Sequence, residues 1–358
     1  MSQGFDLLLI GAGHAHLGVL RLWLSGQRPA GRIGLISEGP CSWYSGMLPG
    51  LLAGRYNAEQ CRVALQPLCA ALDIELFEGR VGALNAKSCC VSLEDGRRLD
   101  SRWLSLNVGS QPAVLSASDG TVEQLPVKPF ARFLDGWSRW QTDPQPLAIV
   151  GGGAAGVELA LALAVQVAGL SLLSSGLLLQ GHPAALRRRA LLHLARAGVQ
   201  VQEGVAVDAI HGDALHAGGQ IVWSGPRAIL ATGATALPWL HGSGLDLDSR
   251  GFVRIGATLQ SLSQPKIFAS GDCASLAQIP RSGVYAVRQG PVLAGNLAAA
   301  LSGKHLTSYL PQKRALALLA DGRGGALMSW AGLTAEGALL GWWKDRLDQG
   351  FIRAHQVR

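Results

Sequence analysis

The stretch "FDLLLIGAGHAHLGVL", residues 5–20, sets the architecture that the rest of the chain must accommodate. Its apolar start is typical of a parallel strand buried on both faces, and a helical pattern follows two closely spaced glycines. Gly11 permits a tight turn, and Gly13 lets the backbone approach a phosphate that rests on the helix N-terminus. The stretch therefore predicts a strand–turn–helix unit that holds the pyrophosphate of a dinucleotide.

The residues that follow this turn complete a βαβ unit and raise one question. "RIGLISE", residues 32–38, predicts the second strand, and Glu38 at its end could accept the hydroxyl hydrogens of a ribose. His16 stands where a small residue normally allows close packing of helix and strand, and His14 at the turn tip could donate to a phosphate. A purely structural role stays open for both histidines. No metal site is predicted, because no further ligand cluster lies nearby.

A second strand–turn–helix unit of this kind begins at "LAIVGGGAAGVELALAL", residues 147–163. Gly151, Gly153 and Gly156 form an unbroken GxGxxG between a predicted strand and a predicted helix. The next strand, "LSLLSS", ends in two serines, whereas a carboxylate there would favour NAD and repel the extra phosphate of NADP. The choice of nicotinamide nucleotide is therefore left open by the sequence.

Composition excludes several other classes. The 358 residues carry a net charge of +7, but no basic stripe with interleaved aromatics predicts nucleic-acid binding. Residues 146–181 contain Glu158 as their only charge, yet their glycines divide them into strand, turn, helix and strand rather than a membrane span. The six cysteines show no CxxC or metal-ligand spacing, and the N-terminus does not look like a signal peptide. We expect reduced thiols and a cytoplasmic location, with the inner face of a membrane as an alternative.

The rest of the chain supplies further strands, turns and helices. We expect a turn-rich segment over 41–56, a short helix over 61–72, alternating strands over 81–93, a strand and glycine turn over 103–112, a linker over 116–121, a strand and glycine turn over 228–238, two strands and an acidic turn over 251–276, and a helix over 283–301. The vicinal pair Cys89–Cys90 is expected in a strand, and Gly341 and Gly350 are expected to bracket a short C-terminal helix.

The order of these motifs resembles a known superfamily. Two fingerprints, an "ATG" turn at 231–233 and a late "IFASGD" at 267–272 are similar to the pyridine nucleotide-disulfide oxidoreductases, flavoproteins with two dinucleotide-binding domains. A closer resemblance is to the family found free-standing or fused N-terminally to selenide, water dikinase. It rests on "GAGHAH", "YSGMLPG", "VYAVRQGPVLAGNL" and "WWKDRLD". Type II NADH dehydrogenases are more distantly similar.

The resemblance implies an α/β fold with two Rossmann-like domains. The first fingerprint would bind FAD and the second NAD(P)H, with the NAD(P) domain inserted in the FAD domain. We expect the FAD domain at 1–115 and 239–302, the NAD(P) domain at 116–238, and a C-terminal segment at 303–358. The residues predicted to bind the cofactors are Gly11, Gly13, His14, His16, Glu38, Met47, Pro49, Val81, Gly109, Gly151, Gly153, Gly156, Ser174, Gly233, Gly271 and Asp272.

The same resemblance implies three catalytic residues: Glu158, Arg288 and Gln289. Glu158 would lie near the nicotinamide, with local capping or pairing as the alternative. Arg288 would stabilise anionic reduced flavin, with a helix salt bridge as the alternative. Two departures limit the resemblance. Only Cys41 lies where disulfide reductases carry a cysteine pair, and Val284 and Arg288 replace the paired glutamines of the type II quinone site.

Three functions stay open at this point. The first is an FAD-dependent NAD(P)H oxidoreductase with a small-molecule acceptor, for which selenium or sulfur chemistry and a link to selenide, water dikinase rest on resemblance alone. The second is a membrane-surface NAD(P)H:quinone reductase, and the third is a nucleotide-binding flavoprotein with a structural or sensing role. The C-terminal tryptophans are read as a layer packed against the FAD domain or a homodimer interface, with a membrane-lying helix as the alternative.

Overall fold

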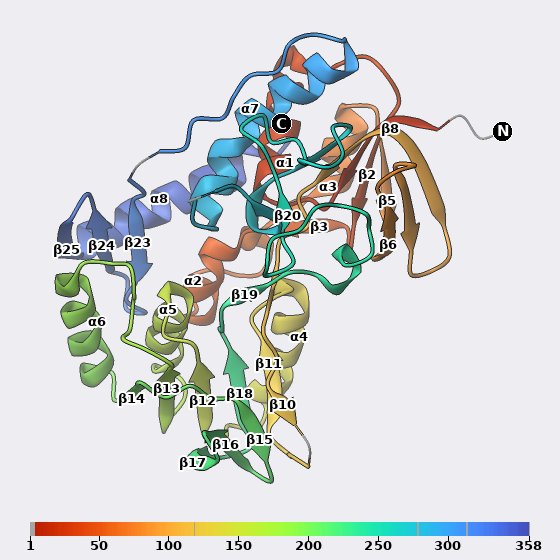
Figure 1. The fold of residues 1–358 in the computed structure, drawn as a ribbon. Helices are drawn as coiled ribbons and strands as arrows, with labels where there is room; N and C mark the ends of the chain where they lie inside the picture. The colour runs from red at the N-terminus through yellow and green to blue at the C-terminus, as the bar shows by residue number, and fades with distance from the viewer. Residues whose placement is uncertain (1–3, 118, 278, 313, 358) are drawn as a thin grey trace.

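The computed structural model describes residues 4–117, 119–277, 279–312 and 314–357. Its first sheet, in the upper half of Figure 1, gathers five parallel strands around β1 (Phe5–Ile10). The others are β2 (Ile33–Ser37), β5 (Ile74–Glu78), β8 (Arg98–Leu106) and β21 (Ile267–Ala269), in the order β5-β2-β1-β8-β21. The side chains from Leu7 to Ile10 and of most of β2 are buried, as expected of strands covered on both faces.

Two helices far apart in the chain lie side by side over this sheet, α1 (His14–Leu22) and α7 (Gly283–Leu301). Their crossing is close because both carry glycine there: a Cβ on Gly290 would lie 3.3 Å from the Cα of Gly18. The predicted helix over 283–301 is confirmed. It places a late segment of the chain directly against the first glycine turn.

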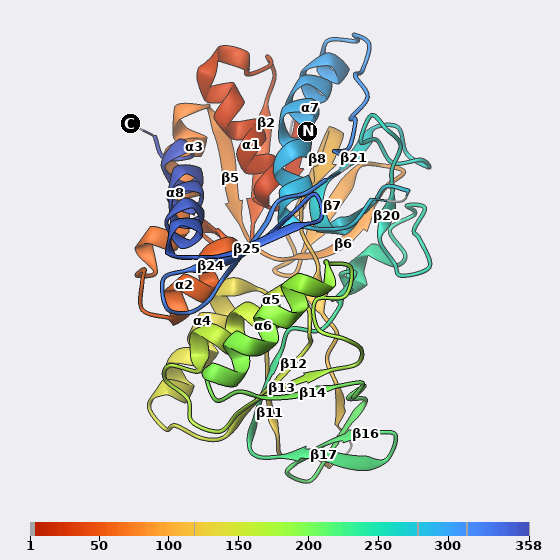
Figure 2. The same cartoon turned by 90° about the vertical axis from the view of Figure 1, so that its left-hand side faces the viewer.

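The second sheet has five parallel strands and lies in the lower half of Figure 1. Its order is β11 (Glu123–Pro126), β18 (Arg227–Leu230), β12 (Leu147–Val150), β13 (Leu170–Ser174) and β14 (Gln200–Glu203). Helices α5 (Ala154–Leu163) and α6 (Ala184–Arg196) lie together in front of it in Figure 2, and α4 (Phe130–Gln141) packs along β11. All of its strands fall between β8 and β21 in the chain, so the unit interrupts the first sheet. The predicted α/β fold with two parallel-sheet units is confirmed.

Smaller elements extend or surround the two sheets. They are β3 (Cys41–Trp43), α2 (Leu48–Leu52), β4 (Arg62–Ala64), α3 (Leu65–Ala71), β6 (Val81–Asn85), β7 (Cys90–Leu93), β9 (Gln111–Pro112), β10 (Ser116–Ala117), β15 (Ala209–His211), β16 (Ala214–Ala217), β17 (Gln220–Ser224), β19 (Ala234–Thr235), β20 (Val253–Arg254) and β22 (Ala274–Ser275). Among them, β7 and β6 continue the first sheet antiparallel beside β8. Strand β10 pairs with β15, so the start of the expected linker 116–121 is part of a small sheet. Ser118 lies outside the described residues.

The C-terminal segment forms an antiparallel sheet, β23 (Ala317–Ala320), β24 (Ala326–Trp330) and β25 (Leu333–Gly337), followed by α8 (Ala338–Ala354). The expected short helix between Gly341 and Gly350 is wrong, because both glycines lie inside a 17-residue helix. A Cβ on Gly341 would overlap the carbonyl oxygen of Gly324, so this glycine allows close packing rather than a helix end. The hairpin packs on α5 and α6, so it covers the second unit and not the first alone.

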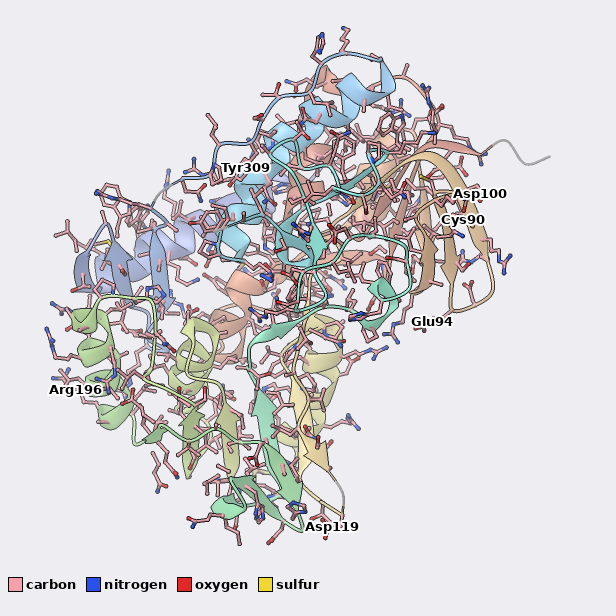
Figure 3. The ribbon with its side chains drawn as sticks, viewed as in Figure 1. Cys90, Glu94, Asp100, Asp119, Arg196 and Tyr309 are labelled. Carbon is pink, nitrogen blue, oxygen red and sulfur yellow. The ribbon has the colours of Figure 1, made fainter. Side chains whose placement is uncertain are left out.

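None of the six cysteines is in a disulfide. Cys89 has a φ of +52° in the turn before β7, so the expectation that both vicinal cysteines lie in a strand is wrong. Cys90 pairs with Asp100 across the β7–β8 ladder at the outer edge of the first sheet (Figure 3). Among the described residues, no helix is both long and apolar enough to cross a membrane.

Candidate cofactor and active site

The first glycine turn is shaped by close backbone approach. Gly11 has a φ of +84°, and a Cβ there would lie 2.6 Å from the carbonyl oxygen of Asn107. A Cβ on Gly13 would overlap the side-chain oxygen of the same asparagine. Both positions therefore require glycine to accommodate the protein itself, quite apart from any ligand.

Asn107, at the carboxyl end of β8, is the residue that this turn surrounds. Its Oδ1 accepts hydrogen bonds from the N–H groups of Ala15 and His16, each at 3.1 Å, and thus caps the first turn of α1 from 91 residues away. Its Nδ2 donates to the carbonyl of Ser270 at 2.8 Å. Within the described part of the chain, the N–H groups of Gly13 and His14 have no acceptor. These two donors are what the helix N-terminus still offers to an anion.

The two histidines of the turn have different surroundings. His16 is fully buried, with Nδ1 bonded to the carbonyl oxygen of Gly11 at 2.5 Å and Nε2 to the hydroxyl of Ser105 at 2.8 Å. Its ring therefore fills the space between helix and strand, and both nitrogens are engaged by protein. This supports the structural role that the sequence left open, and cofactor binding by His16 stays a prediction. Burial lowers its pKa to about 4.

His14 lies instead in an aromatic cluster with the C-terminal helix. Its ring is 5.3 Å from that of Tyr44 and 5.5 Å from that of Phe351, and Phe351 stacks on Tyr44 at 4.4 Å. Burial lowers the pKa of His14 to about 4, so the ring is neutral at pH 7 and offers no cation to a phosphate. Its backbone N–H remains the group best placed for that contact.

Gly271 and Asp272 form the opposite wall of the first turn. One carboxylate oxygen of Asp272 bonds Lys128 at 2.8 Å, and the other is buried without a partner in the described residues. Gln289 was predicted to be catalytic, but its side chain is 4% exposed and accepts the N–H of Gly271 at 2.7 Å. Gln289 thus positions the acidic turn from inside the protein, and a catalytic role for it stays a prediction.

The remaining residues of the first unit that were predicted to bind the cofactor differ in how far they are exposed to solvent. Glu38 is exposed at the end of β2, 3.7 Å from Arg80. Val81 is partly exposed, and a Cβ on Gly109 would meet open space. Met47, at 1% exposure, belongs to the core, so a direct cofactor contact from its side chain is not available. Pro49 is also buried but borders a small pocket that is open to solvent.

The second glycine turn is closely packed against backbone on one side and borders open space on the other. A Cβ on Gly151, whose φ is +132°, would overlap the carbonyl of Ala231, and one on Gly156 would overlap the carbonyl of Gly151. Added Cβ atoms on Gly153 and Gly233 would meet nothing within 4 Å, so these two glycines border open space at the start of α5.

Ser174 was predicted to bind the nucleotide at the end of β13. Ser174 is 5% exposed and its hydroxyl lies under Gly152, and its contact with the nucleotide stays a prediction. The neighbouring Ser175 is the exposed hydroxyl at this strand end.

Glu158 lies where three distant segments meet. Its carboxylate accepts the N–H of Ala320 at 2.7 Å. Beside it, Lys344 of α8 donates to the carbonyl of Gly46 at 2.9 Å and to Asp348 at 2.8 Å. Burial raises the pKa of Glu158 to about 7, against the opposing charge of Lys344. A carboxyl that titrates near neutrality can hold or release a proton at physiological pH.

Arg288 is exposed on α7, close to Tyr309, whose position beside α7 is labelled in Figure 3. The exposed side chains of Val284 and Val287 precede it on the same helix. No ion pair joins Arg288 to a carboxylate among the residues that the structure describes, so the helix salt bridge offered as its alternative role is not formed.

The family model for pyridine nucleotide-disulphide oxidoreductases matches residues 5–290, which include both glycine turns and the acidic turn. The chain belongs to this family. Its members are FAD-dependent oxidoreductases that use NAD(P)H, and this chain is an enzyme of that kind. No curated protein sequence matches the chain.

Solved structures of similar fold have diverse partners. The sulfide:quinone oxidoreductase of Aquifex aeolicus superposes with a TM-score of 0.79 at 16% identity, covering 97% of this chain and 91% of that one. The water-forming NADH oxidase of Lactobacillus brevis, bound to NADH, gives 0.75 at 19%, covering 91% and 75%. The ferredoxin reductase for the CYP199A2 system of Rhodopseudomonas palustris gives 0.75 at 18%, covering 90% and 81%. At these identities the likeness establishes the fold alone.

The residues of the first unit suit FAD. A buried oxygen of Asp272 and the buried hydroxyl of Ser110 both lack a partner in the described chain, and both lie on segments that border the glycine turn. The two backbone N–H groups at the start of α1 that no described residue accepts are available to a diphosphate. The open space before Gly153 and Gly233 suits a second dinucleotide.

Sequence reasoning missed Asn107, Lys128 and Lys344. Lys128 comes after β11 of the second unit, yet it forms an ion pair with Asp272 in the acidic turn of the first unit. Lys344 lies beyond residue 290, where the family match ends. For Asn107, the sequence offers only an asparagine before the "VGS" turn, and a single asparagine does not indicate which residues it will hydrogen-bond.

Proposed function

We propose that the chain binds FAD at the first glycine turn and NAD(P)H at the second, and passes electrons to a small-molecule acceptor. When bound, FAD supplies the chemistry of accepting a hydride from the nicotinamide and passing electrons onward. The protein's part is to bind, orient and exclude water. The observation that carries the proposal is the pair of glycine turns at the starts of α1 and α5. Glu158 of α5 lies beside Lys344, whose ammonium donates to the carbonyl of Gly46 in the first unit.

In the first unit, the N–H groups of Gly13 and His14 would hold the diphosphate. Asp272 would accept hydroxyl hydrogens from the ribityl chain with the oxygen that has no partner among the described residues, and Glu38 those of the adenosine ribose. In the second unit, Gly153 and Gly233 border the space for the nicotinamide nucleotide.

Glu158 would lie beside the nicotinamide and hold a proton close to the reacting rings, because its pKa of about 7 allows both states at neutral pH. Lys344 fixes the carbonyl of Gly46 and the carboxylate of Asp348, and so keeps the Gly46–Pro49 segment in place. Arg288 beside the flavin stays a proposal, supported by the exposure of its side chain on α7.

The acceptor would reach this region through the cavity between α2, the β23–β24 turn and α8. Glycines form much of its wall, including Gly322, Gly325 and Gly341, and Arg55 and Tyr56 also line it. This lining supports a small polar acceptor. A cysteine relay is not proposed, because Cys41 has no second cysteine near it in the sequence where disulfide reductases carry a pair. A selenium or sulfur compound as acceptor rests on the family resemblance.

Anaerobic stopped-flow mixing with NADH and NADPH tests the proposal directly. We expect yellow protein whose flavin absorbance is bleached by at least one nucleotide, and reoxidised by some member of a panel of small acceptors and a ubiquinone analogue. Folded wild-type protein that refuses added FAD would refute the proposal. Flavin that neither nucleotide reduces would instead support a sensing or structural role.

A second candidate, a membrane-surface NAD(P)H:quinone reductase, is favoured by one observation. Helix α8 turns Lys344 and Asp348 inward and exposes Leu339, Trp342 and Leu347, with 83%, 59% and 48% of their surface accessible. Arg346 and Arg353 of the same helix are also exposed. Such a face suits an anionic lipid surface or a second copy of the chain. Co-sedimentation with anionic vesicles, lost in Trp342→Ser, would support the membrane. Concentration-dependent dimerisation, lost in the same variant, would support a homodimer.

A further inference from the structure

The edge of the second sheet holds a charge pair that the sequence did not reveal. Strand β13 ends without an acid, but β14 runs parallel beside it and its last residue, Glu203, is the register partner of Ser174. A carboxylate therefore lies at the height where a dinucleotide-binding unit normally carries its ribose-binding acid, on the next strand. The exposed hydroxyl of Ser175 follows directly on β13.

Arg187 of α6 holds this carboxylate in a fork. Its Nε donates to Oε1 of Glu203 at 2.8 Å, and its Nη2 donates to Oε2 in a shorter contact. The N–H of Leu178, in the loop after β13, also donates to Oε1, at 2.5 Å. Because Arg187 hydrogen-bonds the carboxylate, the pKa of Glu203 falls below its ordinary range and the group stays ionised at neutral pH. The two side chains keep 27% and 20% of their surface, so both are reachable from solvent.

We infer that the Arg187–Glu203 pair sets the choice between NADH and NADPH at the second glycine turn. The inference rests on the proposed binding of a nicotinamide nucleotide there. A free carboxylate at this edge accepts the ribose 2′-hydroxyl and repels a 2′-phosphate, whereas a free guanidinium binds the phosphate through a bidentate fork. In the native pair the two charges cancel, and the Ser175 hydroxyl is neutral toward both nucleotides.

Two substitutions should change the affinity of this site for 2′,5′-ADP in opposite directions. Glu203→Gln releases the guanidinium and should raise the affinity for 2′,5′-ADP about tenfold, with 5′-AMP affinity nearly unchanged, as expected for a newly freed arginine facing a phosphate. Arg187→Gln releases the carboxylate and should lower 2′,5′-ADP affinity by about the same factor. The wild-type protein should accept NADH and NADPH with kcat/KM values within about tenfold of each other, because its pair is neutral.

Arg189→Gln is the matched control. Arg189 lies on the same helix and also forms an ion pair, with Glu336 at 3.1 Å, but that pair faces the C-terminal hairpin rather than the strand edge. Its loss should leave the ratio of the two affinities unchanged.

Titration calorimetry of the FAD-loaded protein with 2′,5′-ADP and 5′-AMP measures these affinities, and circular dichroism checks that each variant is folded. Opposite shifts in Glu203→Gln and Arg187→Gln support the inference. Wild-type protein that binds the probes, with a ratio that moves less than about threefold in folded Glu203→Gln, overturns it. If wild-type protein binds neither probe, the proposed function fails instead. Should Arg187→Gln not fold, the shift measured in Glu203→Gln still supports or overturns the inference.

Discussion

Replacing Asn107 by alanine tests how the first glycine turn is built. The side chain makes three hydrogen bonds, two accepted from the start of α1 and one donated to the carbonyl of Ser270. Alanine removes all three and leaves two N–H groups and one carbonyl without their partners. The turn and the Gly271–Asp272 wall should then lose their mutual position, although every residue predicted to touch FAD is still present.

The expected loss of stability follows from the number of hydrogen bonds that the substitution removes. At about 1 kcal/mol for each buried hydrogen bond, the free energy of unfolding should fall by about 3 kcal/mol. Asn296 in α7 provides a matched control, since it is also buried and makes three hydrogen bonds, to Thr258 and Thr307. Asn296→Ala should therefore cost a similar free energy but leave the glycine turn intact.

Two measurements separate structural from cofactor effects. Urea unfolding of the apoproteins should show similar losses for both variants. FAD titration followed by flavin fluorescence should show at least about tenfold weaker binding for Asn107→Ala, the equivalent of about 1.4 kcal/mol, and little change for Asn296→Ala. Equal FAD affinity in the two folded variants would refute the view that Asn107 organises the cofactor site.

Three further predictions concern the second turn, the central carboxyl and the C-terminal helix. Gly153→Val should fold normally and keep FAD but lose NAD(P)H binding, because its side chain enters open space, whereas Gly151→Ala should lower the melting temperature through overlap with backbone; calorimetry and thermal melts distinguish them. Because the pKa of Glu158 is raised to about 7, the native state binds a proton more tightly than the unfolded chain, and stability falls as pH rises from 4.5 towards 7. Glu158→Gln should remove this fall, and unfolding curves at pH 5 and pH 8 that keep it would contradict the assignment. Phe351→Ala removes the ring stacked on Tyr44 and should cost about 1–2 kcal/mol, while FAD dissociates faster from the loosened site; an unchanged release rate would show that α8 does not help to retain the cofactor.

The two strand–turn–helix units could be read from the sequence because their requirements are local. Gly11 and Gly151 need a positive φ, the strands before them are continuously apolar, and the helices begin directly after. The carboxylate that would bind the ribose in the second unit could not be read from local sequence. The end of β13, where local sequence places a ribose partner, carries serine, while the carboxylate beside it in the sheet, Glu203, comes from the adjacent strand.

Roles of individual side chains near the turns could not be read in the same way. His14 and His16 are two residues apart, yet one joins an aromatic cluster with Phe351 and the other fills the space beside Ser105. Gln289 lies inside the motif that carries the resemblance but faces the protein interior. Contacts of this kind join residues that are distant in the chain, so they depend on how the helices pack.

The amino-acid sequence alone determined that this chain contains two glycine turns at helix N-termini, each after a buried strand, because backbone conformation and apolar patterning are properties of neighbouring residues. Which side chains face those turns was set by the tertiary structure. Asn107, Lys128, Glu203 and Lys344 reach the sites from other segments of the chain. A hydrogen bond or ion pair needs only nearness in space, and nothing in local sequence encodes which distant segment will supply it.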